Sequence, residues 1–317
     1  MSKVKKSLTV LYWLASLGII AGSIFLMFGG ADMIEEKFKI GPFSEANKMP
    51  PQPPVPPPAP PPPPPPPEKP APVIYEGART SLPIGDLTKF FQRKEFLTQD
   101  SHRAHTLTYY LYSPPGPYPE GLKFPLVLLL HDVHGKADAG QFLIAGDTPV
   151  AHPAFIVAPV LPFAKKWAMP QDFPELPGFE PVPRGREGLK DAVALVDKLK
   201  ASYPIDPARV YVVGCSDGGF GAFGAALRYP DLFAAAIPIA SGWTAQDAKG
   251  FSKVPLWIFH GSEDSAYSSE LSRSAASYIK AYGGKVNYTE VPGVGHECDS
   301  AQFYRPALWD WLFSQHK

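Results

Sequence analysis

The chain has 317 residues, of which 30 are basic and 30 acidic, so its formal net charge is zero and nothing in its charge points to a nucleic-acid partner. Its 40 prolines far exceed average usage, but many of them fall in one tract, so they describe a linker and not a core. About 245 residues remain beyond that tract, enough for one α/β domain with a sizeable core.

The N-terminal segment predicts a membrane anchor. Residues 1–7 carry three lysines, and residues 8–28 are an uncharged run that makes about 30 Å of helix, enough to span a bilayer. The positive charge before the span places residues 1–7 in the cytoplasm and the rest of the chain on the far side of the membrane, in the periplasm or at the cell surface. The alternative is a signal peptide cleaved near residues 29–31, although the apolar run is longer than is usual for one.

Residues 29–72 are predicted to form a linker. Positions 50–72 hold 17 prolines in 23 residues, a composition that favours a stiff polyproline II helix, roughly 70 Å long if fully extended. The tract is typical of a spacer that holds the following domain, residues 73–317, away from a membrane. A ligand for SH3-type domains is the alternative use of such a sequence.

The domain itself alternates strands and helices. Two amphipathic strands are expected at 94–97 and 106–112, and apolar runs predict further strands at 125–130, 155–160, 210–213, 254–259 and 285–291. Helices are expected at 187–199, at 220–229, between the last two strands, and around Leu308, Trp309, Trp311 and Leu312. This order predicts an α/β fold, with a mostly parallel central sheet flanked by helices.

Ser216 is the candidate nucleophile. It lies in the run Gly214-Cys-Ser-Asp-Gly218, between a predicted strand and a predicted helix, which is the context of a nucleophile elbow. In such a turn the serine backbone is strained, and side chains two residues to either side would collide with the crossing strand and helix. Ser216 is expected to stand exposed above the sheet, at the positive end of a helix that stabilises negative charge.

Asp264 and His296 each follow a predicted strand, so the order Ser, Asp, His is that of a hydrolase triad. Glu263 is the rival acid for the aspartate position. Four stretches, the first of which contains the elbow, carry a resemblance to a known superfamily: Arg209-Val-Tyr-Val-Val-Gly-Cys-Ser-Asp-Gly-Gly, Arg228-Tyr-Pro-Asp-Leu-Phe-Ala-Ala-Ala, His260-Gly-Ser-Glu-Asp and Gly293-Val-Gly-His. From about residue 73 onward the chain resembles α/β-hydrolases of the esterase, polyester-depolymerase and predicted-peptidase type.

The resemblance implies a serine hydrolase that cleaves small-molecule or polymeric carboxylic esters through an acyl-enzyme. Ser216 would attack, His296 would take its proton, and Asp264 would fix the imidazole. This chemistry needs no metal and no organic cofactor. A serine peptidase of prolyl-oligopeptidase-like type is one alternative, and a non-catalytic envelope binding protein on the same fold is another.

The resemblance also implies an oxyanion hole made by the backbone amides of Val133 and Asp217. Asp132 departs from the pattern, because it stands where the resembled proteins usually have glycine, and a carboxylate beside an anion site opposes oxyanion formation unless it points away. The nearby pair His131 and His134 raises the alternative of a metal site, but no clear third ligand accompanies them.

Trp167 lies in a proline-rich loop and is a candidate substrate-pocket residue, together with Phe173 and Phe179. The aromatic residues could equally pin the loop to the domain surface.

Cys215 and Cys298 are the only cysteines, and we expect a disulfide between them. An even count outside the cytoplasm favours oxidation, and the triad would bring the two loops together. Some tannase and feruloyl-esterase relatives resemble this chain in joining a cysteine before the serine to one after the histidine, although Glu297 intervenes here. A small buried residue at 215 and a free thiol at 298 are the alternative.

Overall fold

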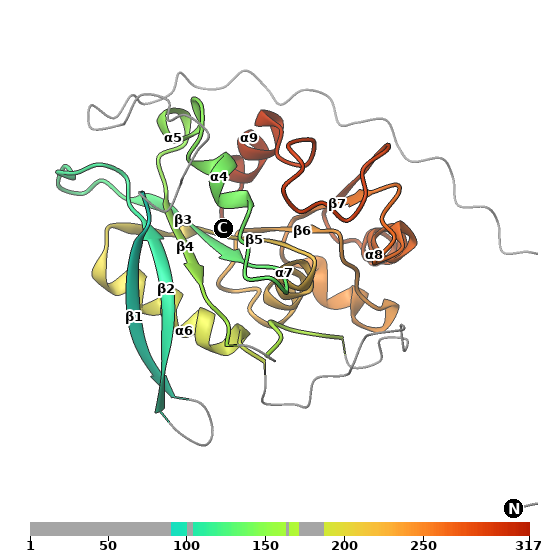
Figure 1. The fold of residues 1–317 in the computed structure, drawn as a ribbon, viewed down its shortest axis with the longest axis horizontal. Coiled ribbons are helices and arrows are strands. Elements are labelled where there is room, and N and C mark those ends of the chain that lie inside the picture. Colours follow the sequence, from blue (N-terminus) through green and yellow to red (C-terminus); the bar gives the residue numbers. More distant parts are fainter. Residues whose placement is uncertain (1–89, 100–103, 163–164, 171–186) are drawn as a thin grey trace, which may run out of the picture. The chain divides into compact units, whose positions relative to one another are not determined.

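An eight-stranded sheet is the centre of the domain (Figure 1). The computed structural model describes residues 90–99, 104–162, 165–170 and 187–317, all within the unit Pro66–Lys317. The strands are β1 (Gln92–Gln99), β2 (Ala104–Tyr112), β3 (Phe124–Leu130), β4 (Phe155–Pro159), β5 (Ile205–Cys215), β6 (Ala235–Ile239), β7 (Leu256–Gly261) and β8 (Val286–Val291).

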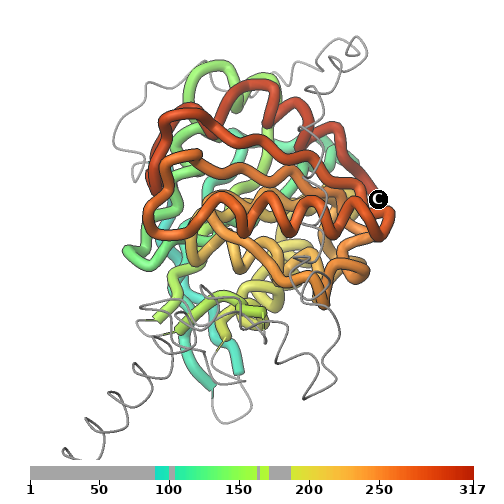
Figure 2. The backbone as a smooth tube through the Cα atoms, turned by 90° about the vertical axis from the view of Figure 1, so that its right-hand side faces the viewer, coloured from blue at the N-terminus to red at the C-terminus, as the bar shows by residue number. Residues whose placement is uncertain are grey.

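The strand order is β1-β2-β4-β3-β5-β6-β7-β8. The β1–β2 and β2–β4 pairs are antiparallel, and every pair from β4–β3 to β7–β8 is parallel. Figure 2 shows the first hairpin and the last segments of the chain, coloured orange and red, on opposite sides of the domain. The mostly parallel sheet predicted from the sequence is confirmed.

Helices cover both faces of the sheet. One face packs against α6 (Leu189–Ser202), α7 (Asp217–Arg228), α8 (Ser269–Ala281) and the 3-10 helix η2 (Ala245–Ser252). The other packs against α4 (Ala139–Leu143) and α9 (Pro306–Ser314), and the short α5 (Thr148–Ala151) precedes β4. Because both faces are covered, the central strand β3 is buried at every position, which explains its unbroken apolar run.

The sequence did not predict strand β6, although it forms the middle of the sheet's parallel half. Its two alanines and Pro238 are poor strand residues beside its two isoleucines, and Pro238 cannot donate a ladder hydrogen bond. The strand is held instead by full burial between β5 and β7. Here the tertiary environment overrides a weak local signal.

The predicted anchor at 8–28 and the predicted linker at 29–72 lie outside the described residues, as do Phe173 and Phe179. Over the ranges that the structure does describe, no helix is both long enough and apolar enough to cross a membrane.

Candidate active site

Ser216 sits in a sharp turn between β5 and α7, and its φ of 56° lies in the left-handed region that serine rarely adopts. The flanking glycines make the turn possible. A Cβ on Gly214 would lie 2.0 Å from the carbonyl oxygen of Gly218, and one on Gly218 would lie 1.9 Å from that of Leu130. The strained elbow expected from the sequence is therefore present, and it is fixed by backbone collisions that only glycine avoids.

The expectation that Ser216 stands exposed was wrong, because the residue is only 3% exposed. Its backbone N–H donates to the carbonyl of Ile239 at 3.0 Å, and His296 lies directly against its hydroxyl. The chain around the elbow therefore covers the serine and leaves it buried rather than projecting into solvent.

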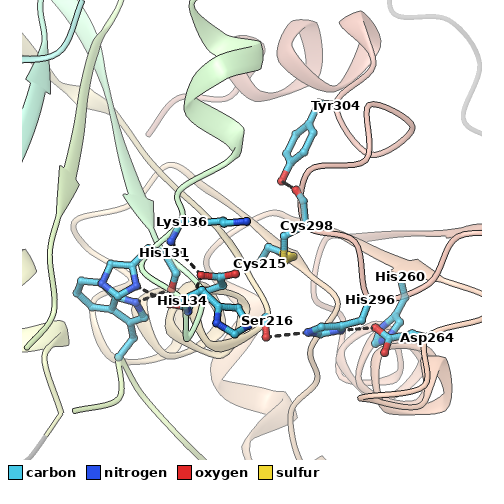
Figure 3. The surroundings of a disulfide bond; sticks show 12 residues. His131, His134, Lys136, Cys215, Ser216, His260, Asp264, His296, Cys298 and Tyr304 are labelled. Carbon is cyan, nitrogen blue, oxygen red and sulfur yellow. Dashed lines mark hydrogen bonds and ion pairs between the residues drawn. A yellow bond between two sulfur atoms is a disulfide. The ribbon is translucent and has the colours of Figure 1, made fainter. Parts of the chain in front are cut away.

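Ser216, His296 and Asp264 form one hydrogen-bonded row (Figure 3). His296 Nε2 is 2.9 Å from Ser216 Oγ, and His296 Nδ1 is 2.7 Å from Asp264 Oδ2. A carboxylate only accepts, so Nδ1–H donates to Asp264, which leaves Nε2 to accept from the serine hydroxyl in the neutral ring. This tautomer can take a proton from Ser216 as the hydroxyl attacks an electrophile.

Asp264 is held in place from both of its oxygens. Oδ1 accepts from the backbone N–H groups of Ala266 and Tyr267, at 2.9 and 2.8 Å. Burial opposes its ionisation, but hydrogen bonds from His260, His296 and the Tyr267 N–H prevail and hold the pKa of Asp264 well below its usual range. Glu263, the rival acid, is exposed, and the carboxylate that lies against His296 is that of Asp264.

The loop after β3 resolves the conflict posed by Asp132. The Asp132 carboxylate turns back into its own loop, where Oδ1 accepts from the N–H groups of His134 and Lys136 at 2.8 and 2.9 Å. The carboxylate is thus committed to shaping the turn. Val133, at the tip of this turn, is 55% exposed.

His131 also stabilises the loop after β3, through hydrogen bonds at both of its ring nitrogens. Its Nδ1 lies 2.5 Å from the carbonyl of Asp132, and its Nε2 accepts from the N–H of Leu161 at 2.9 Å. One nitrogen donates and the other accepts, so the ring is neutral. Within the described ranges, no group of three or more His, Cys, Asp or Glu side chains is placed to hold a metal ion.

The side chain of Trp167 is fully buried. Its indole N–H donates to the carbonyl of His131 at 2.9 Å, and its ring packs edge-on against the imidazole of that residue. A Cβ on Gly221 of α7 would lie 2.6 Å from Trp167 Cβ, so the tryptophan also fills a notch in the helix. It joins the loop after β3 to α7, and these contacts agree with the alternative in which the tryptophan pins its loop to the domain.

Asp217, the residue after Ser216, carries a buried carboxylate that the sequence did not explain. Its Oδ1 lies 2.9 Å from Nζ of Lys166, and only 4% of its side chain is exposed. Burial raises the pKa of Asp217, and the neighbouring Lys166 ammonium counteracts part of that rise. Asp217 is also the first residue of α7, where the backbone N–H has no acceptor within the helix.

Cys215 and Cys298 are joined by a disulfide, as expected from the resemblance. The bond ties the residue before Ser216 to the loop that carries His296 (Figure 3). Tyr304 fixes the same loop, since its hydroxyl donates to the carbonyl of Cys298 at 2.8 Å. Two covalently linked loops therefore supply the serine and the histidine.

Sequence reasoning missed two groups at this site, His260 and Lys166. His260 is the first residue of the His-Gly-x-x-Asp run and contacts Asp264 Oδ2 at 3.2 Å, so the i, i+4 spacing was an available signal. Lys166 gave no such signal, because it reaches Asp217 from a segment 51 positions earlier in the chain.

The strand order, the elbow and the Ser-His-Asp row together define an α/β-hydrolase. The family described as Phospholipase/Carboxylesterase matches residues 119–305, and the chain belongs to that family.

Known proteins agree with this placement. A probable carboxylesterase, SOBER1-like, of Arabidopsis thaliana is 29% identical over 148 residues, which are 44% of this chain and 56% of that protein. Poly(3-hydroxyalkanoate) depolymerase C of Paucimonas lemoignei is 47% identical over 66 residues, 20% of this chain and 16% of that protein. A crystal structure of a thermostable esterase superposes with a TM-score of 0.62 at 28% identity, covering 73% of this chain and 64% of that one. The chain thus spans only part of the length of these relatives.

Proposed function

We propose that this chain is a membrane-anchored, extracytoplasmic serine esterase. The observation that carries the proposal is the hydrogen-bonded row from Ser216 through His296 to Asp264, with contacts of 2.9 and 2.7 Å, set on a strained elbow. Membership of the Phospholipase/Carboxylesterase family favours a carboxylic ester as the substrate. The depolymerase among the relatives extends the candidates from small esters to polyesters.

In the proposed mechanism, Ser216 Oγ attacks the acyl carbonyl carbon while its proton passes to His296 Nε2. The tetrahedral oxyanion accepts hydrogen bonds from the backbone amides of Val133 and Asp217. His296 then returns the proton to the departing alkoxide, which leaves an acyl group on Ser216. Water repeats the sequence, with His296 as base and then as acid, and releases the carboxylic acid. Asp264 holds the imidazole tautomer and stabilises its transient positive charge.

A panel of chromogenic esters set beside a panel of peptide amides tests the function. We expect steady turnover of esters, with kcat/KM at least about a hundredfold above that for any peptide amide. The converse preference would establish a peptidase. Turnover of neither panel would point to a binding protein on a hydrolase fold.

The Lys166–Asp217 ion pair gives a prediction about the oxyanion site. Replacing Lys166 by Met leaves a buried carboxylate without its counter-charge, one residue from the nucleophile. We expect kcat to fall by about tenfold at pH 8, because that carboxylate opposes the oxyanion. The double variant Lys166→Met/Asp217→Asn removes the charge as well and is expected to recover most of the loss.

Lys165→Met is the matched control. Lys165 also meets an aspartate, with its Nζ 3.9 Å from Oδ2 of Asp191, but that aspartate belongs to α6 and not to the elbow. The control should keep near-wild-type kcat. If the double variant stayed as slow as Lys166→Met, the charge would not be the cause.

The proposed topology has one span at 8–28, residues 1–7 in the cytoplasm, and the hydrolase domain beyond the linker on the other side. It is supported by the lysines before the span and by the stiffness expected of the proline tract. Protease added to intact spheroplasts is expected to release a soluble, active fragment that begins near the proline tract. Protection of the domain under those conditions would reverse the orientation.

A further inference from the structure

His260, in strand β7, is a second histidine that contacts Asp264, in addition to His296. Its Nε2 lies 3.2 Å from Asp264 Oδ2, the same oxygen that His296 Nδ1 contacts at 2.7 Å. Neither the His260 nor the Asp264 side chain has exposed surface. Figure 3 shows His260 beside Asp264, at the end of the row that begins with Ser216.

The hydrogen-bond partners of His260 determine its protonation. Nε2 faces two acceptors, the carboxylate of Asp264 and the carbonyl of Tyr267 at 3.0 Å, so Nε2 must carry a hydrogen. Nδ1 faces the hydroxyl of Ser272 at 2.7 Å, and that hydroxyl lies 2.5 Å from the carbonyl of Ser241.

Ser272 has a single hydroxyl hydrogen, and a carbonyl can only accept. The hydrogen therefore goes to Ser241, which leaves Ser272 Oγ as the acceptor of a hydrogen on His260 Nδ1. By this count both ring nitrogens of His260 donate. The same counting gives a neutral ring for His131, whose partners are one acceptor and one donor.

Besides Asp264, Glu290 is an acid that interacts electrostatically with His260. Glu290 of β8 lies opposite His260 in the sheet register, but it accepts from Arg273 of α8 at 2.6 Å and from the hydroxyl of Tyr288 at 2.5 Å. Burial raises the pKa of Tyr267 to about 12, so its phenol is neutral. Asp264 is the remaining partner, and His296 shares it.

We propose that His260 is a buried imidazolium which acts through Asp264 as a positioning residue, and that its charge keeps His296 unprotonated at more acidic pH than Asp264 alone would allow. The proposal rests on the esterase function. His260 Nε2 and His296 Nδ1 both contact Asp264 Oδ2, so they lie at most roughly 6 Å apart. At that distance two positive charges repel each other appreciably, even in a moderately polarisable interior. A second positive charge on His296 is therefore disfavoured.

His260→Gln tests the kinetic consequence, because the amide can still donate to Asp264 but carries no charge. We expect the acid limb of the kcat/KM profile to move up by about one pH unit, with the plateau within about fivefold of wild type. Ser272→Ala, which removes the acceptor at Nδ1, should move the limb in the same direction. Ser277 is an exposed residue on the same helix, α8, so Ser277→Ala is the control. It should leave the acid limb at its wild-type pH.

The charge on the His260 ring can be measured without an activity assay. In nitrogen-15 spectra of the full-length protein at pH 7.5, we expect signals of an imidazole with both nitrogens protonated that vanish in His260→Gln. A neutral His260 ring would overturn the proposal, and so would a lowered plateau with an unmoved acid limb. An inactive wild-type chain whose spectrum shows the imidazolium would refute the esterase function and the pH effect, but not the charge.

Discussion

Replacing Ser216 by alanine is expected to lower ester hydrolysis by at least about a thousandfold while leaving the domain folded. The variant removes the oxygen that becomes acylated in the proposed mechanism, and loss of a triad member in serine hydrolases typically costs several powers of ten in kcat. The fold should tolerate the change, because the oxygen that is lost bonds to His296 and the backbone N–H bond to Ile239 is retained.

The measurement is kcat for a chromogenic ester, with circular dichroism and thermal unfolding as the check on folding. Ser262→Ala is a suitable control, since that exposed serine accepts a hydrogen bond from the backbone N–H of Gly293 in the neighbouring loop. A folded Ser216→Ala variant with even a tenth of wild-type activity would show that Ser216 is not the nucleophile.

Asp264→Asn is expected to lower kcat by roughly three to four powers of ten. The amide can present its N–H₂ to His296 and so hold the wrong tautomer, and it cannot stabilise the imidazolium that forms during attack. A second cost arises at His260, which loses the carboxylate that balances its charge. Both effects act through the one oxygen that the two histidines share.

Glu263→Gln is the matched control, because it makes the same chemical change at the adjacent position. Glu263 is exposed and takes part in the loop through its backbone N–H, which donates to Val294 at 2.9 Å. The control should keep more than about half of wild-type kcat. Equal damage from both substitutions would contradict the assignment of Asp264 as the third member of the row.

The sequence predicted the Ser216, Asp264 and His296 arrangement because local rules govern where these residues lie. Only glycines fit at 214 and 218, where a Cβ would strike backbone atoms, so the elbow must show itself as a motif. Asp264 and His296 follow parallel strands β7 and β8, and the carboxyl ends of parallel strands meet at one edge of a sheet. Both constraints can be recognised in the sequence, as a glycine motif and as polar residues that follow predicted strands.

What the sequence did not predict depends on contacts between distant segments. The direction of the Asp132 carboxylate, the burial of Trp167 and the pairing of Lys166 with Asp217 all follow from how two loops pack, and no spacing rule encodes them. Strand β6 was missed for a related reason, since its alanines and Pro238 are held by neighbours rather than by their own preference. Ser216 is covered for the same reason, although an elbow by itself suggests exposure.

The most direct test of the central claim is the site of covalent labelling by a fluorophosphonate. The probe forms a stable bond only with a serine that a neighbouring base has activated. Labelling therefore reports a functional Ser-His-Asp arrangement and not merely the presence of the Gly-x-Ser-x-Gly motif. The intact protein is expected to gain the mass of one adduct, mapped by peptide sequencing to Ser216. Labelling should be absent in Ser216→Ala and strongly slowed in His296→Ala. An adduct on another residue, or no adduct on the folded wild-type protein, would contradict the account.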